Sequence, residues 1–213
     1  MRQHLAIAAL LLSSIATPAA ATTVLDPTGD FIPSFTGTQS PQLDATSFTA
    51  LYDPGTQMFA LSGTLAGIID PEVESYFVIG VDTGAGAIAP FGSIGEPNVI
   101  FDQVVIVDAE GAAFVGNNNL PFTISGNTFS VSVPLALLPS TGLDPLGYSF
   151  NLWPRNDLTP SNLAAISDFA PDNARIHASA VPEPATWLTM LGGFALIGGA
   201  LRRRRSRKLQ QAA

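Results

Sequence analysis

Two apolar segments flanked by basic residues, one at each end of the chain, limit which residues can form a globular fold. At the N-terminus, Arg2 and His4 precede an apolar run over residues 5–15, and small residues follow it up to Ala21. This order is typical of a secretory signal peptide that is cleaved after Ala21. We therefore predict a signal peptide over residues 1–21 and exclude it from the fold.

The C-terminal apolar segment covers residues 185–201 and is followed by a basic tail, residues 202–213. Seventeen residues rising about 1.5 Å each give a helix of roughly 25 Å, slightly shorter than a hydrocarbon core of about 30 Å. Moving the six basic residues of the tail outward against a potential of 100 mV would cost roughly 14 kcal/mol, at about 2.3 kcal/mol per charge. We predict one transmembrane helix with a cytoplasmic tail, and everything before the helix lies outside.

A short motif precedes this apolar segment, so that motif, apolar span and basic tail follow one another. The motif consists of Val181, Pro182, Glu183 and Pro184, and the tail opens with Arg202, Arg203, Arg204 and Arg205. The order resembles the PEP-CTERM sorting signal of Gram-negative bacteria that make extracellular polysaccharide. The resemblance implies processing by signal peptidase and by exosortase at the inner membrane, the latter at or beside residues 181–184. It also implies a final location in the cell envelope, on the outer surface or in the extracellular matrix.

The remaining part, residues 22–180, has room for one domain with a single substantial core. All 17 acidic residues of the chain lie between Asp26 and Glu183, against only Arg155 and Arg175, which leaves a formal charge of −15. Nucleic acid is excluded as a partner, because phosphate binding requires clustered lysine and arginine. The same charge favours divalent cations and solubility. The absence of cysteine excludes disulfide scaffolds and thiol chemistry.

Alternation of apolar and polar residues predicts β-strands in this domain. Residues 128–133 alternate strictly and place Phe129, Val131 and Val133 on one face, and residues 146–153 repeat the pattern. Both runs are typical of half-buried strands.

Other runs complete an all-β pattern. Residues 43–51 and 57–66 flank a Tyr-Asp-Pro-Gly-Thr turn, which predicts a hairpin. Residues 75–81 and 99–107 are dense in Val, Ile and Phe, as expected of central strands covered on both faces. A turn or two of helix is predicted only around residues 161–166. We predict a single antiparallel β-sandwich, jelly-roll-like, of about eight or nine strands.

Acidic residues near both ends of the domain suggest a metal site. Asp26 and Asp30 frame a Pro-Thr-Gly turn, and Asp44 lies in the string Leu-Asp-Ala-Thr-Ser-Phe. This opening resembles DOMON-like and family-9 carbohydrate-binding β-sandwiches, which often hold a structural Ca²⁺ through oxygen ligands. The resemblance implies Asp26, Asp30 and Asp44 as ligands, completed by Asp168 or Asp172. The alternative is that these carboxylates cap turns without a metal.

Two short motifs match enzyme or sorting signals that we do not adopt. Residues 138–142 read Leu-Pro-Ser-Thr-Gly like a sortase signal, but such a site must directly precede the membrane span, so we interpret them as a turn that ends a strand. Residues 82–84 read Asp-Thr-Gly, as in aspartic proteases, where two carboxylates share one proton. Because one copy exists, we interpret Asp82 as the end of a strand that enters a glycine-rich turn.

The domain offers little material for other catalysis. One histidine, His177, lies in it, which excludes histidine triads and multi-histidine zinc sites. Tyr52, Phe91, Tyr148 and Trp153 could stack on sugars, but alternation places Tyr148 and Trp153 on opposite faces, which favours packing. We predict that the protein is not an enzyme but a structural or binding module, with carbohydrate as the candidate ligand. The alternative is a small envelope hydrolase that uses paired carboxylates.

Overall fold

The computed structural model describes three stretches of the chain: residues 22–86, 90–181 and 191–197. The chain divides into two compact units. One unit is Ala19–Glu183, and the other combines Met1–Pro18 with Pro184–Ala213. The boundary between the units falls inside the predicted sorting motif.

The predicted targeting segments lie largely outside the described residues. These segments are the signal peptide over residues 1–21, the motif residues Pro182, Glu183 and Pro184, and the tail with Arg202, Arg203, Arg204 and Arg205. Of the predicted span over residues 185–201, residues 191–197 are described, and they are helical. No helix within the described stretches has the length and apolar character needed to cross a membrane. The transmembrane helix therefore stays a prediction.

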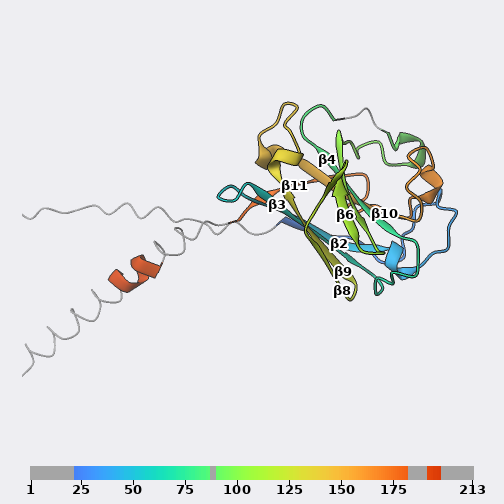
Figure 1. Cartoon of the computed structure of the whole chain (residues 1–213), viewed down its shortest axis with the longest axis horizontal. Helices are drawn as coiled ribbons and strands as arrows, with labels where there is room; N and C mark the ends of the chain where they lie inside the picture. The colour runs from blue at the N-terminus through green and yellow to red at the C-terminus, as the bar shows by residue number, and fades with distance from the viewer. Residues whose placement is uncertain (1–21, 87–89, 182–190, 198–213) are drawn as a thin grey trace, which may run out of the picture. The chain divides into compact units, whose positions relative to one another are not determined.

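The unit Ala19–Glu183 contains two six-stranded sheets (Figure 1). The first sheet has the order β1-β2-β3-β9-β8, with β12 also pairing with β2. Its strands are β1 (Thr22–Leu25), β2 (Ala45–Asp53), β3 (Met58–Leu65), β8 (Phe122–Ser125), β9 (Thr128–Pro134) and β12 (Ser179–Ala180).

The second sheet has the order β11-β10-β4-β5-β6-β7. Its strands are β4 (Tyr76–Asp82), β5 (Gln103–Asp108), β6 (Ala112–Val115), β7 (Asn118–Asn119), β10 (Ser149–Arg155) and β11 (Ile176–His177). Five short 3-10 helices connect strands within the described residues: η1 (Pro41–Leu43), η2 (Gly92–Ile94), η3 (Leu135–Leu137), η4 (Pro145–Gly147) and η5 (Leu163–Ala165).

This architecture confirms the predicted β-sandwich. Pairing is antiparallel throughout both sheets, except that β12 pairs in parallel with β2. The predicted hairpin forms between β2 and β3, with Asp53 opposite Met58. The described residues hold twelve strands, more than the eight or nine predicted, because six of them have only two to four residues. Such short strands carry too little alternation to be recognised in a sequence.

The main core lies between the two sheets. In β9, Phe129, Val131 and Val133 are at most 2% exposed, which confirms the face predicted from alternation. The rings of Phe77 in β4 and Phe129 stack with 4.9 Å between centroids and so join the two sheets. Each fully buried phenylalanine contributes about 1.5–3 kcal/mol relative to an exposed one. The sandwich is therefore held together mainly by this aromatic and aliphatic layer.

A second core covers the opposite face of the second sheet. Trp153 of β10 packs there against Phe91 and Phe169, with ring centroids 5.1 and 6.1 Å away. Tyr148 instead belongs to the main core, so alternation correctly placed Tyr148 and Trp153 on opposite faces. The four candidates for sugar stacking, Tyr52, Phe91, Tyr148 and Trp153, are at most 6% exposed. They are core residues, and a sugar-stacking platform does not form from them.

Backbone contacts tie the loops of this second core to β10. Ala170 and Leu152 exchange two backbone hydrogen bonds of 2.8 and 3.0 Å, and the Ile32 N–H donates to the Ser167 carbonyl at 2.9 Å. An N-terminal loop and a C-terminal segment therefore meet beside the same strand. This contact brings acidic residues of the two segments to the same corner of the sandwich.

Candidate functional site

The acidic loop after β1 is held against the beginning of β2. The Asp26 N–H donates to the Thr46 carbonyl at 3.0 Å, and the Gly29 N–H donates to Oδ2 of Asp44 at 2.8 Å. Gly29 has a φ of 85°, a left-handed conformation that glycine adopts without steric cost. The turn brings Asp30 back toward Asp26.

Asp168 reaches the same corner from the segment after η5. The Ser167 hydroxyl anchors this segment by donating to the Leu43 carbonyl at 2.6 Å. Asp168 is fully buried, and its two carboxylate oxygens accept the N–H groups of Ala45 and Phe169, each at 2.8 Å. These bonds fix the direction of the carboxylate.

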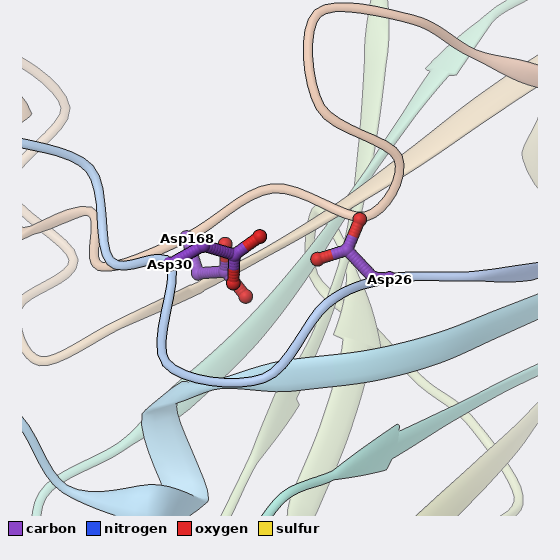
Figure 2. Close-up of side chains that lie close together, drawn as sticks. All are labelled: Asp26, Asp30 and Asp168. Atoms are coloured by element: carbon purple, nitrogen blue, oxygen red, sulfur yellow. The ribbon is translucent and has the colours of Figure 1, made fainter.

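Three carboxylates converge at this corner (Figure 2). One oxygen from each of Asp26, Asp30 and Asp168 lies within 4.8 Å of the other two. Four carboxylate oxygens at this corner are buried and have no hydrogen-bond partner among the described residues: Oδ2 of Asp26, both oxygens of Asp30, and Oδ1 of Asp44. Orphaned buried acceptors are costly, about 1–3 kcal/mol each or more when charged. Within residues 22–86 and 90–181, the cluster therefore has no positively charged partner.

Burial and like charge shift the protonation of these residues. Burial raises the pKa of Asp168 to about 9, and the charges of Asp26 and Asp30 add to this effect. The pKa of Asp26 rises to about 8, first through burial and then through the charges of Asp172 and Asp30. The pKa values of Asp44 and Asp172 also rise, mainly through burial. Without a cation, part of the cluster stays protonated at neutral pH.

The donor set fits Ca²⁺. Calcium binds six to eight oxygen ligands at about 2.3–2.6 Å, so two ligand oxygens on opposite sides of the ion are at most roughly 5 Å apart. The spacing within 4.8 Å falls inside this limit. Asp26, Asp30 and Asp168 would hold the ion, and the unpartnered oxygen of Asp44 is a further ligand candidate. Carboxylate oxygens suit calcium better than softer metals, which prefer nitrogen or sulfur.

The five acids predicted as ligands thus have different positions. Asp26, Asp30 and Asp168 come together, and Asp44 is 3% exposed and bonded to the same loop. Asp172 is exposed and lies outside the converging group, although its charge acts on Asp26. The turn-cap alternative describes part of the role of Asp44, because its Oδ2 accepts the Gly29 N–H. It leaves the orphaned oxygens unexplained.

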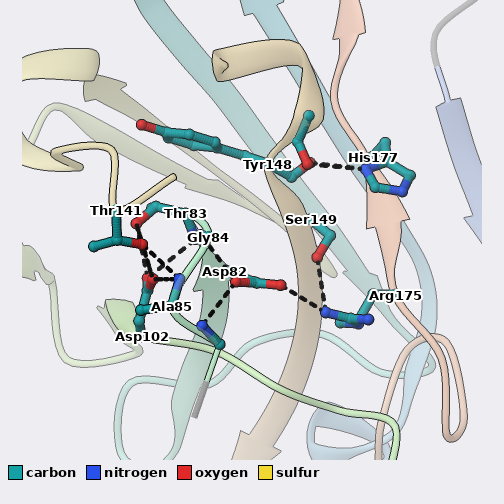
Figure 3. Close-up of polar contacts among 12 residues, drawn as sticks. Asp82, Thr83, Gly84, Ala85, Asp102, Thr141, Tyr148, Ser149, Arg175 and His177 are labelled. Carbon is teal, nitrogen blue, oxygen red and sulfur yellow. Dashed lines mark hydrogen bonds and ion pairs between the residues drawn. The ribbon is translucent and has the colours of Figure 1, made fainter. Parts of the chain in front are cut away.

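The Asp-Thr-Gly segment ends β4 in a polar network (Figure 3). Asp82 accepts the Gly84 N–H at 3.0 Å and forms an ion pair of 2.8 Å with Arg175. Its partner is a guanidinium group, whereas a protease dyad needs a second carboxylate that shares a proton. The segment therefore serves as the turn that we predicted.

The Leu-Pro-Ser-Thr-Gly segment is part of the same network. The Thr141 hydroxyl donates to Asp102 at 2.7 Å, and the Thr83 hydroxyl lies 2.9 Å from the same carboxylate oxygen. Sequence reasoning missed Asp102 and Arg175. Nothing in the spacing indicated their contacts, although Arg175 was visible as one of two basic residues in the domain.

The sorting motif begins where the sheet ends. Ala180 of β12 pairs with Tyr52, and the Val181 N–H donates to the Tyr52 carbonyl at 2.8 Å. Val181 is half-buried. The next three residues, Pro182, Glu183 and Pro184, lie outside the described residues.

Comparison with known proteins assigns this C-terminal region. Residues 180–205 match the model of the PEP-CTERM protein-sorting motif. No curated protein matches the chain. The match over residues 180–205 does not include the N-terminal acidic loop. The resemblance of that loop to DOMON-like and family-9 carbohydrate-binding sandwiches is therefore unsupported. The chain carries a PEP-CTERM sorting motif, which indicates an exported protein that exosortase processes at the cell envelope.

Proposed function

We propose that the exported sandwich is a non-catalytic structural or binding module of the outer envelope or the extracellular polysaccharide matrix, with a fold stabilised by Ca²⁺. The observation that carries the proposal is the set of orphaned carboxylate oxygens around Asp168. A structural cation would satisfy them and would join the N-terminal loop to the C-terminal segment. The sorting motif supports the location.

The competing function is a small hydrolase, and the raised pKa values of Asp26 and Asp168 favour it, because such enzymes use a protonated carboxylic acid. The burial of these carboxylates argues against a hydrolase, because a substrate must reach them. Asp168 is fully buried, and each orphaned oxygen has less than 1 Å² of exposed surface. A polysaccharide cannot bring its glycosidic bond to groups covered in this way.

Thermal melting of residues 22–181 in EDTA and in millimolar CaCl₂ tests the metal. Both cores consist entirely of residues within this stretch, so it contains what its fold requires. Saturating Ca²⁺ at about 100 times its Kd should raise the unfolding free energy by about 2.7 kcal/mol. Asp30→Asn should abolish this gain, and in EDTA it should be at least as stable as the native domain because it removes a repelling charge.

Glu72→Gln is the matched control, since it removes an exposed negative charge outside the cluster. It should keep the full Ca²⁺ effect. Identical melting of the native domain with and without Ca²⁺ would disprove the metal centre. Hydrolysis of polysaccharide by the purified domain, lost in Asp26→Asn, would establish the hydrolase instead.

A further inference from the structure

Arg175 stands out in a domain dominated by negative charge. Within the described sandwich, Arg155 and Arg175 are the only arginines, and lysine is absent. Arg155 is 6% exposed and donates to the backbone carbonyls of Asp157, Thr159 and Asn162. The side chain of Arg175 is 29% exposed. Arg175 is thus the guanidinium that a ligand can reach.

Arg175 lines a pocket of about 310 Å³ beside the edge strand β11. The other lining residues are Asn98, Ser149, Asn173, Ala174 and His177. None is phenylalanine, tyrosine or tryptophan, and most are hydrogen-bonding residues. The pocket therefore suits a small polar ligand better than one that stacks on aromatic rings.

The structure holds Arg175 in place and leaves donors available (Figure 3). Its Nη1 donates to Asp82 at 2.8 Å and lies 3.3 Å from the Ser149 hydroxyl. Its Nε and Nη2 make no hydrogen bond to any residue that the structure describes. These two groups form the planar fork that binds both oxygens of one carboxylate.

The rim of the pocket is also fixed and polar. The Asn98 N–H donates to Oδ1 of Asn173 at 2.9 Å, and the Asn173 N–H donates to Glu96. Nδ1 of His177 lies 3.2 Å from the carbonyl oxygen of Gly147, which can only accept, so Nδ1 donates there and Nε2 is left for a ligand. Nε2 and the Asn98 amide are suitable partners for hydroxyl groups.

We propose that this pocket binds a hydroxylated monocarboxylate, a sugar acid, whose carboxylate pairs with Arg175 and whose hydroxyl groups bond to Asn98 and His177. Arg175 is already paired with Asp82, and residues 22–181 hold 16 acidic residues against two arginines, a formal charge of −14, so a ligand with one negative charge is repelled less than a phosphate dianion. The inference rests on the binding role proposed above but uses a different site from the metal centre. Asp82 acts as a positioning residue for the guanidinium.

NMR titration of isotope-labelled residues 22–181 tests the site with glucuronate as the probe. Glucuronate should give saturable shifts at Asn98, Ser149 and residues 173–177. Glucose, which lacks the carboxylate, and acetate, which lacks the hydroxyl groups, should each bind at least about tenfold more weakly, a difference of about 1.4 kcal/mol. Equal responses to glucuronate and either control, or no saturable response, would overturn the proposal.

Variants separate binding from folding. Arg175→Lys keeps the charge but loses the fork, so it should weaken glucuronate binding at least about tenfold, by about 1.4 kcal/mol. Asn98→Ala changes an exposed side chain and should weaken binding with an unchanged melting temperature. Asp82→Asn should weaken glucuronate and acetate by a similar factor, because both carboxylates use the guanidinium that Asp82 positions. Unaltered glucuronate binding in both Arg175→Lys and Asn98→Ala would refute the site.

Glu110→Gln, an exposed acid outside the lining, is the charge control and should bind as the native domain does. The Ca²⁺ melting experiment gives an independent result. A missing Ca²⁺ effect with glucuronate binding intact removes the metal centre alone, and the reverse result removes the sugar-acid site alone.

Discussion

At the residue scale, the acidic corner is stable only if its charge is neutralised, and either protons or a cation can do this. In the unfolded chain, Asp26 has a pKa near 3.8, whereas in the folded domain burial and neighbouring charges raise it to about 8. The folded state therefore binds more protons than the unfolded state between these two values. A cation with the same contacts would displace those protons.

We expect the metal-free domain to lose stability as pH rises from about 4 to about 8. The sign follows from the raised pKa of Asp26: its contribution is fully present below the unfolded value and is lost as pH approaches the folded value. Asp26→Asn should reduce the slope by less than about 1.4 kcal/mol per pH unit, the value for one proton, because partial exposure screens the shift. Urea denaturation in EDTA at pH 5, 6 and 7 measures it.

Added Ca²⁺ should flatten or reverse this slope in the native domain, because ionised carboxylates bind the ion best. Glu72→Gln should retain the native slope. Stability that increases from pH 5 to pH 7 in EDTA would contradict the assigned protonation of the corner.

The candidate site was predictable only in part. Asp26 and Asp30 stand out in the sequence because they frame a turn, but their approach to Asp168 depends on the backbone contact between Ile32 and Ser167. Contacts between residues so distant in sequence leave no local pattern. For the same reason, the pairing of Arg175 with Asp82, 93 positions apart, had no sequence signal.

At the scale of elements, alternation predicted the long strands and failed for the short ones. The run in β9 is long enough to show one buried face, whereas β7, β11 and β12 have two residues each. The strand predicted over residues 99–107 begins at Gln103, because the preceding residues cover the second core instead of joining the sheet. Hydrophobicity alone does not distinguish these two uses of apolar residues.

The contact between Gly80 of β4 and Trp153 of the neighbouring strand β10 gives a test of the second core. Gly80 lies beneath the indole ring of Trp153, and a Cβ atom there would overlap the ring and approach Cβ of Phe101 to 3.1 Å. Gly80→Ala should therefore lower the unfolding free energy by about 1–3 kcal/mol through overpacking. Denaturant melts of the purified domain measure the loss.

Gly92→Ala provides the comparison, because a Cβ atom at Gly92 would meet its nearest neighbour at 3.9 Å. It should change stability by less than about 0.5 kcal/mol. Equal stability of the Gly80 and Gly92 variants would mean that Trp153 can move aside and that the second core is loosely packed.

At the scale of the whole molecule, the sandwich and the sorting signal share a boundary. The matched motif starts at residue 180, yet Ala180 still pairs with Tyr52 and the Val181 N–H still binds the sheet. The domain therefore ends directly at the Pro-Glu-Pro sequence, without a linker. This arrangement suits a module that is released or transferred as an intact fold after cleavage.

Sorting should depend on both the motif and the basic tail. Glu183→Gln should block processing and leave the full-length chain at the inner membrane. Deletion of residues 202–205 leaves two of the six basic residues, so the cost of moving the tail outward falls from roughly 14 to about 5 kcal/mol at 100 mV. The deletion variant should therefore accumulate unprocessed as well, because its orientation is less strongly held.

Immunoblotting of membrane and extracellular fractions measures this accumulation, and mass spectrometry of the mature protein locates its C-terminus. In the native protein we expect that end at or beside residues 181–184. Glu72→Gln should mature normally, since it removes a charge outside the motif. Normal maturation of the Glu183→Gln and tail-deletion variants would show that exosortase does not require the motif. The location proposed for the domain would then need another carrier, whereas the metal centre and the sugar-acid pocket would stand on their own tests.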